Sequence, residues 1–167
     1  MKIKKNNLLS LDDYMGEALY NKKFGYYMYK NPFGKSGDFI TAPNISVIFS
    51  EMIAIWIISF WENLKCPNEF NLIELGAGNG EMMRILIMTF EKFPKFKNAC
   101  KINILEKSNL LKKLQKKNIN NKNIKWLKNI NDLNNLPCLF IANEFFDAIP
   151  IKQFIKKKMI GMKDMLN

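Results

Sequence analysis

The sequence has no histidine and a single arginine, Arg84, among its 167 residues. Without histidine, imidazole-based acid or base catalysis and most transition-metal sites are excluded, so we expect no metal. The net charge is +11, and 25 of the 26 basic residues are lysine. Bidentate recognition of bases and phosphates favours arginine. We therefore interpret the positive charge as lysines on solvent-exposed faces in preference to a nucleic-acid binding site.

Cysteine is scarce, and long apolar runs are nearly absent. Cys66, Cys100 and Cys138 are odd in number and form no Cys-x-x-Cys pair, so neither a disulfide framework nor a zinc site is indicated. The apolar run 45–61 contains Glu51 and is shorter than the roughly 20 residues of a membrane span, so we predict a buried helix and no membrane span. The N-terminus lacks the apolar core of a signal peptide, and we expect a cytoplasmic, bacterial protein.

The stretch from 70 to 80, Phe-Asn-Leu-Ile-Glu-Leu-Gly-Ala-Gly-Asn-Gly, predicts a strand followed by a glycine turn. A helix-forming run starts directly after the third glycine. Glycine allows the backbone to turn sharply and to approach a ligand, and the start of a helix offers unpaired N–H groups. The turn is therefore a candidate cofactor site made of Gly76, Ala77, Gly78 and Gly80.

The spacing of this turn bears on which cofactor it binds. The dinucleotide fingerprint is Gly-x-Gly-x-x-Gly, whereas this turn reads Gly-x-Gly-x-Gly and has Glu74 two residues before it. A carboxylate disfavours a pyrophosphate and suits an ammonium or sulfonium group. The pattern resembles motif I of the class I S-adenosylmethionine-dependent methyltransferases. A tight turn without a ligand and an NAD-dependent oxidoreductase remain the alternatives.

Further strands and helices alternate along the chain. We expect strands at 101–105, 124–127 and 138–142 and a helix over 109–117 capped by Ser108. Such alternation predicts an α/β fold with a parallel sheet covered by helices on both faces, in which ligands bind beyond the carboxyl ends of the strands. Glu106 ends the second strand, where a carboxylate can accept both hydrogen bonds of a ribose diol, and Asp132 is a candidate for the adenine amino group.

The first 65 residues differ in character from the rest. Ser10 precedes two carboxylates and is a candidate N-cap for a helix of about ten residues. Residues 24–43 are rich in Gly, Pro and aromatic side chains, which predicts a long ordered loop with a function. We therefore divide the chain into residues 1–65, with helices and a cofactor-covering loop, and residues 66–167, the N-terminal half of a cofactor-binding domain.

Several spaced motifs together resemble the MidA family of class I methyltransferases: Gly-Tyr-Tyr at 25–27, Ser-Gly-Asp-Phe-Ile-Thr-Ala-Pro at 36–43, Leu-Gly-Ala-Gly-Asn-Gly at 75–80 and Asn-Glu-Phe-Phe-Asp-Ala-Ile-Pro at 143–150. The resemblance implies a Rossmann-like fold that binds S-adenosyl-L-methionine. It further implies a cover over the cofactor that includes Gly37, Asp38, Phe39, Thr41 and Pro43.

That family includes a mitochondrial complex I assembly factor that methylates protein arginine. The resemblance therefore implies a protein substrate, a respiratory complex I subunit, and a role in assembly. It also implies Asn143 and Glu144 as catalytic residues beside the transferring methyl group, and Asp147 is the second candidate, after Glu144, for a catalytic carboxylate. A carboxylate such as Glu144 can orient a guanidinium and favour its attacking lone pair. Phe145 and Phe146 either stack on that cation or pack in the core.

The chain departs from the family after its fourth strand, at about half the expected length. If A/T-rich codons are assumed, a one-base shift in the lysine run 156–158 restores the family's Trp-x-Glu-Arg-x-Val pattern, so we hypothesise a frame slip there. An inactive truncated fragment or a binding-only module is thus an alternative function, and a nucleic-acid methyltransferase is a weaker one. Alone, the chain is expected to aggregate, to bind cofactor weakly and to transfer no methyl group.

Overall fold

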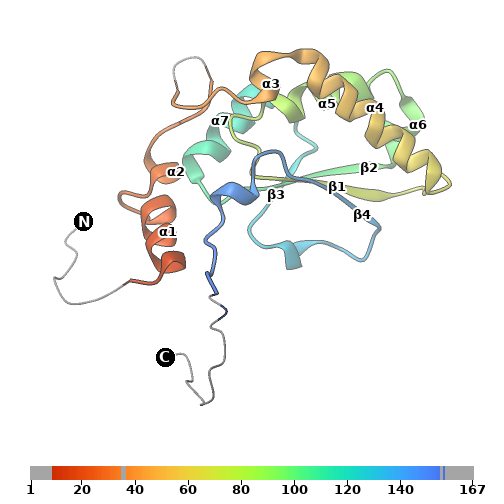
Figure 1. The fold of residues 1–167 in the computed structure, drawn as a ribbon. Helices are drawn as coiled ribbons and strands as arrows, with labels where there is room; N and C mark the ends of the chain where they lie inside the picture. The colour runs from red at the N-terminus through yellow and green to blue at the C-terminus, as the bar shows by residue number, and fades with distance from the viewer. Residues whose placement is uncertain (1–8, 35–36, 155, 157–167) are drawn as a thin grey trace.

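A four-stranded parallel sheet forms the centre of the computed structural model, which describes residues 9–34, 37–154 and 156 (Figure 1). The strands lie in the order β3-β2-β1-β4, and each adjacent pair is parallel. Their bounds are Phe70–Leu75 for β1, Cys100–Leu105 for β2, Lys125–Leu127 for β3 and Cys138–Ile141 for β4. The predicted α/β fold with a parallel sheet is confirmed. The predicted frame slip and the tail lie outside the described residues, except for Lys156.

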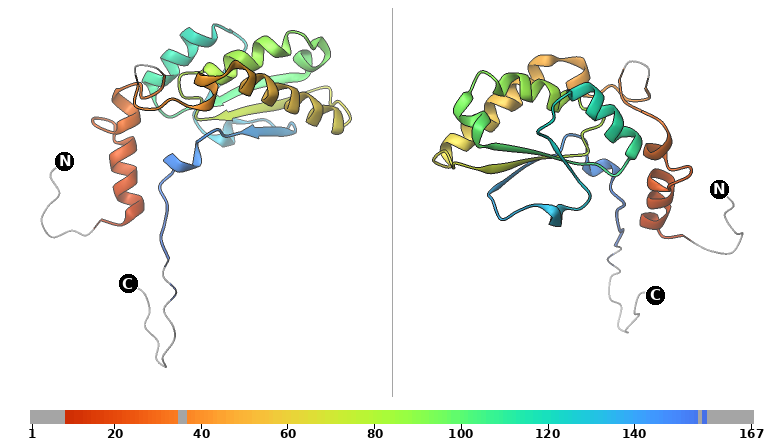
Figure 2. Two further views of the ribbon diagram at one scale, coloured as in Figure 1. Left: turned by 45° about the horizontal axis from the view of Figure 1, so that its top comes forward. Right: turned by 180° about the vertical axis from the view of Figure 1, so that it is seen from behind.

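The longer helices that pack against the sheet lie on one of its faces. Figure 2 shows α4 (Val47–Asn63), α5 (Glu81–Phe90) and α7 (Asn109–Ile119) on that face. The loop between β3 and β4, which contains the short helix η1 (Ile130–Asp132), lies on the other side. The sequence predicted helices on both faces of the sheet. In the described residues, helices cover one face and this loop lies on the other.

The core lies between the sheet and these helices. Leu72 of β1 pairs with Ile102 and Leu139 in the neighbouring strands and is fully buried. The aromatic rings of Phe90 and Phe96 lie with their centroids 4.6 Å apart beneath α5. Phe96 comes from α6 (Pro94–Ala99), a short helix that the sequence analysis missed although a proline stands in its first turn.

Helix α4 corrects the prediction of a buried helix. Its buried side includes Ala54 and Ile57, but the opposite side exposes Ile48, Met52 and Trp56 to between 52% and 67%. The run is apolar on all sides, so its periodicity could not reveal that only one face packs against the core. Within the described residues, no helix combines the length and apolar character that a membrane crossing requires.

The N-terminal segment reaches the carboxyl-end edge of the sheet (Figure 1). Helix α1 (Leu11–Tyr20) begins as predicted, since the Ser10 hydroxyl accepts a hydrogen bond from the Asp13 N–H. The expected loop at 24–43 holds two short helices, α2 (Tyr26–Tyr29) and α3 (Ala42–Ile45). It also contains a β-bridge between Phe33 and Phe39. The division after residue 65 stays a prediction.

Candidate functional site

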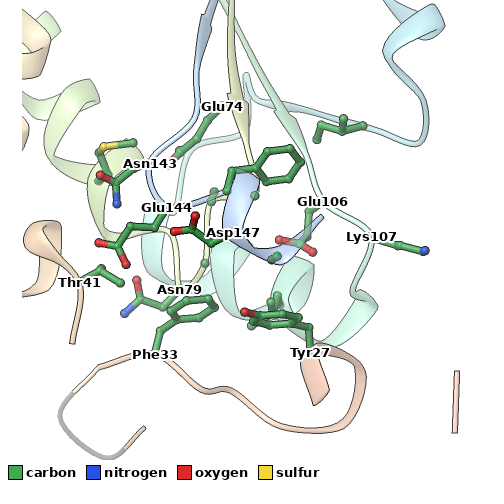
Figure 3. A pocket seen from close by; sticks show the side chains of 18 of the residues that line it. Tyr27, Phe33, Thr41, Glu74, Asn79, Glu106, Lys107, Asn143, Glu144 and Asp147 are labelled. Atoms are coloured by element: carbon green, nitrogen blue, oxygen red, sulfur yellow. The ribbon is translucent and has the colours of Figure 1, made fainter. Parts of the chain in front are cut away.

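A cavity of about 640 Å³ lies at the carboxyl ends of the strands. Its walls come from the glycine turn after β1, the ends of β2 and β4, the short helix η2 (Phe146–Ala148) and the N-terminal segment (Figure 3). Most of the residues that the sequence singled out line it: Phe39, Thr41, Pro43, Glu74, Gly76, Ala77, Gly78, Glu106, Asn143, Glu144 and Asp147. Segments more than 100 residues apart in the sequence therefore meet in one cavity.

Other predicted site residues lie outside the cavity lining. A Cβ atom on Gly80 would stand 3.1 Å from Ile119 Cγ1, so this glycine faces α7 and starts α5. Asp38 is exposed and accepts hydrogen bonds from Lys30 and from the Tyr26 hydroxyl, and Lys30 in turn lowers the pKa of that carboxyl.

Two further predicted site residues, Gly37 and Asp132, make contacts outside the cavity. Gly37 packs against the Pro32 carbonyl, which a Cβ atom would approach to 2.3 Å. Asp132 accepts hydrogen bonds from the backbone of Lys128 and Asn129 and closes the capping box of η1. Neither residue lines the cavity, although Lys128 itself does.

The glycine turn is shaped by close contacts. Gly76 has φ +65°, and a Cβ atom there would stand 2.6 Å from Cδ2 of Phe145. Its N–H donates to the Leu105 carbonyl at 3.0 Å, which ties the turn to the end of β2. Only glycine accommodates both the left-handed backbone and the aromatic ring, so this position fixes the turn against the segment after β4.

Glu74 is the most perturbed group in the cavity. Its side chain is 3% exposed, and its Oε2 atom has no hydrogen-bond partner within the described part of the chain. Burial, followed by the negative charge of Glu106, raises the pKa of Glu74 to about 8. A buried carboxyl oxygen without a donor is costly. The cavity floor therefore offers an acceptor that a cationic or N–H-bearing ligand could satisfy.

Glu106 is held in a fixed orientation beside the cavity. Its Oε1 accepts a hydrogen bond from the Ser108 N–H at 2.8 Å, and its Oε2 accepts one from Gln115 Nε2 at 3.0 Å. Burial raises the pKa of Glu106, and these two hydrogen bonds partly oppose that rise. Each carboxylate oxygen can accept a further hydrogen bond, so the group can still accept hydrogen bonds from two hydroxyl groups of a ligand.

The segment after β4 presents two carboxylates, Glu144 and Asp147, to the same space as Asn79 (Figure 3). Glu144 has φ +49°, a left-handed conformation that costs a non-glycine residue about 1–3 kcal/mol. The Tyr20 hydroxyl donates to the Ala148 carbonyl at 2.7 Å and anchors this segment to α1. Burial, followed by the charge of Asp147, raises the pKa of Tyr27.

An aromatic wall on the N-terminal side of the cavity was not predicted from the sequence. It consists of Tyr20, Tyr27 and Phe33, and the rings of Tyr27 and Phe33 stack with centroids 6.2 Å apart. The density of aromatic side chains between residues 24 and 33 was the available signal. The sequence did not indicate that these rings point into the cavity. Within the described residues, no group of three or more His, Cys, Asp or Glu side chains could hold a metal ion.

A model of a family of S-adenosyl-L-methionine-dependent methyltransferases matches residues 52–165. The chain belongs to this family. The resemblance to the MidA methyltransferases is thereby confirmed, and S-adenosyl-L-methionine is the cofactor of the family. The match includes the glycine turn, Glu106 and the segment after β4, which together line the cavity.

Curated relatives of the chain are named protein arginine methyltransferases. The chain is 33% identical to the mitochondrial protein arginine methyltransferase NDUFAF7 of Xenopus laevis over 189 residues, covering 99% of this chain and 43% of the relative. It is 30% identical to the human NDUFAF7 over 179 residues, covering 93% of this chain and 41% of the relative. The chain thus spans about two-fifths of the length of the curated relatives that it matches.

Solved structures confirm the fold. A crystal structure of a protein from Burkholderia thailandensis, bound to S-adenosyl-homocysteine, superposes with a TM-score of 0.70 at 22% identity and covers 85% of this chain and 38% of that one. A native crystal structure from the same organism gives a TM-score of 0.65 at 22% identity, with 86% and 36% covered. Both show that the described residues share the fold of these proteins.

Proposed function

We propose that the cavity binds S-adenosyl-L-methionine and that the chain supplies the cofactor-binding half of a protein-arginine methyltransferase. The observation that carries the proposal is the unpartnered Oε2 atom of Glu74, buried at the cavity floor beside the glycine turn. An ammonium group would satisfy this atom and favour the ionised carboxylate, whereas a pyrophosphate would do neither. The cavity volume of about 640 Å³ lies in the range, roughly 300–1,000 Å³, that encloses ligands of this size.

Different residues of the cavity would contact different parts of the cofactor. Glu106, already oriented by Ser108 and Gln115, would accept hydrogen bonds from the ribose hydroxyl groups. The backbone at Gly76 and Gly78 would lie along the amino-acid part, whose ammonium group Glu74 would neutralise. When bound, the cofactor supplies a methyl group activated by its sulfonium. The chain's own task is then to position the acceptor and to exclude water.

The substrate side of the cavity suits a guanidinium. Glu144 and Asp147 would orient the planar cation through hydrogen bonds, and Asn143 would lie beside the methyl group. Phe146 is 66% exposed and could stack on the same cation, while Phe145 packs on Gly76. The relatives named as protein arginine methyltransferases support this choice. A complex I subunit is the substrate that the family resemblance implies, and a cytoplasmic location stays a prediction.

The test of substrate class uses a cell lysate and methyl-labelled cofactor with the complete gene product. Label that survives nuclease and is released by protease supports a protein substrate, and label on arginine after hydrolysis supports the guanidinium. Glu144→Gln should lose transfer while Glu62→Gln, an exposed change on α4, retains it. Label lost on nuclease digestion would instead favour methylation of nucleic acid.

A further inference from the structure

Gln115 of α7 connects three parts of the molecule through one side chain. It is fully buried, with an exposed fraction of 0%. Its Nε2 atom donates to the Gly78 carbonyl at 3.0 Å and to Glu106 Oε2 at 3.0 Å, while its Oε1 atom accepts from Trp126 Nε1 at 3.0 Å. The glycine turn, the end of β2 and strand β3 therefore meet at a single amide.

The partners fix the orientation of this amide. The Gly78 carbonyl can only accept a hydrogen bond, and the Trp126 indole N–H can only donate one. Turning the Gln115 amide over would place its oxygen against two acceptors and leave the indole N–H without one. Trp126 thus determines which atom of Gln115 faces Glu106, although Trp126 does not line the cavity.

The same helix holds the glycine turn at a second point. Asn118, one turn after Gln115, donates from Nδ2 to the Asn79 carbonyl at 2.9 Å. In a trans peptide the carbonyl and the following N–H point in opposite directions. With the Gly78 carbonyl fixed on α7, the N–H of Asn79 is therefore turned away from α7. This geometry sets the direction of a donor in a residue that lines the cavity.

We propose that Gln115 is a positioning residue for the cofactor, holding the Glu106 carboxylate and the glycine turn at the separation that the ribose and the amino-acid part of one ligand require. The inference rests on the proposed function and goes beyond it, because Gln115 does not line the cavity. Without Gln115, the Glu106 carboxylate loses the side-chain partner of its Oε2 atom and can rotate away from the ribose, while the Ser108 N–H still binds Oε1.

The experiment measures discrimination, since any destabilising change could weaken binding. The affinities of S-adenosylhomocysteine and its 2′-deoxy analogue are measured by calorimetry for the complete gene product. A hydroxyl bonded to a carboxylate is worth about ten-fold or more in affinity, so the unmodified chain should prefer S-adenosylhomocysteine by that factor. In Gln115→Met, which keeps the length of the side chain and removes its hydrogen bonds, we expect the preference to fall below about three-fold.

Two further variants complete the design. Trp126→Phe leaves Gln115 in place but removes the N–H that orients it, so its preference should be intermediate, and this variant carries the test if Gln115→Met does not fold. The double variant should be no worse than Gln115→Met alone, because both act through one group. Lys113→Ala, an exposed change on α7, should leave the preference unchanged.

Each outcome decides between the claims. If Gln115→Met and Trp126→Phe weaken both ligands by the same factor, Gln115 is merely structural and the inference is overturned. If the unmodified chain binds both ligands equally, Glu106 does not hold the ribose, and the inference falls while cofactor binding stands. If the unmodified chain binds neither ligand, the proposed function fails as well.

Discussion

Binding of the cofactor should release a proton from Glu74. In the empty cavity this carboxyl is buried, and its pKa is raised to about 8, so it is mostly protonated at neutral pH. A ligand ammonium placed against Oε2 would stabilise the ionised form and lower that pKa. Binding and deprotonation are then coupled, and the coupling is measurable without any methyl transfer.

The expected size of this effect follows from the raised pKa. At pH 7 a group with a pKa of about 8 is about 90% protonated, so ionisation on binding would release about 0.9 proton per ligand. The ligand's α-amino group, with an ordinary pKa near 8, would take up only about 0.1 proton at this pH. The rise from 4.5 to about 8 corresponds to roughly 5 kcal/mol of unfavourable ionisation in the empty protein.

The assay is calorimetry at pH 7 in buffers with different heats of ionisation. The slope of the observed heat against the buffer's heat gives the number of protons released. S-adenosylhomocysteine should give a slope near 0.8 proton. 5′-Methylthioadenosine, which lacks the amino-acid part, should give about zero, and so should Glu74→Gln with either ligand. Glu62→Gln is the matched control at an exposed position and should behave as the unmodified chain.

The stability of the empty protein gives an independent check. Because the folded-state pKa of Glu74 is raised, its contribution to stability is complete below pH 4.5 and is lost as the pH rises through about 8. The melting temperature should therefore fall between pH 6 and pH 8.5, and the fall should be smaller in Glu74→Gln. Proton release that persists in Glu74→Gln, or that is absent from the unmodified chain, would refute the reasoning.

Three substitutions test other contacts of the site. Gly76→Ala should cost about 1–2 kcal/mol for its positive φ, and it should also displace Phe145 and weaken S-adenosylhomocysteine binding in calorimetry. Tyr20→Phe should lower stability to denaturant by about 1 kcal/mol by removing the bond to the Ala148 carbonyl, whereas Tyr14→Phe, at an exposed position, should not; equal effects would contradict the anchoring role. Glu144→Gly should be more stable than Glu144→Ala by about 1 kcal/mol, because both lose the carboxylate but only glycine relieves the left-handed backbone; a more stable alanine variant would contradict this.

Much of the fold was predictable because local signals agreed with the tertiary structure. The strand 70–75 is apolar except at Asn71 and Glu74. The glycine turn marks the start of α5, and the Ser108 cap marks the start of α7. Helix α4 was predictable in type but not in burial, since its apolar residues surround the helix and only packing decides which face is covered.

The site was predictable where a residue's position along a strand determines its place in space. Glu74 and Glu106 lie at strand ends, so the parallel sheet brings them to one edge. Asp38 lies in a loop outside the sheet, where no strand fixes its direction, and it pairs with Lys30 and Tyr26 instead of reaching the cavity. Gln115 was missed because a buried glutamine inside an amphipathic helix has no local pattern that distinguishes it from a surface residue.

The most direct test of the central claim is a calorimetric titration of the complete gene product with S-adenosylhomocysteine and, separately, with NADH. All of the proposed cofactor contacts lie within this chain, so the account predicts saturable binding of S-adenosylhomocysteine at one site and no binding of NADH. Glu106→Gln should weaken the first titration while Glu62→Gln leaves it unchanged. Binding of NADH without binding of S-adenosylhomocysteine would contradict the account.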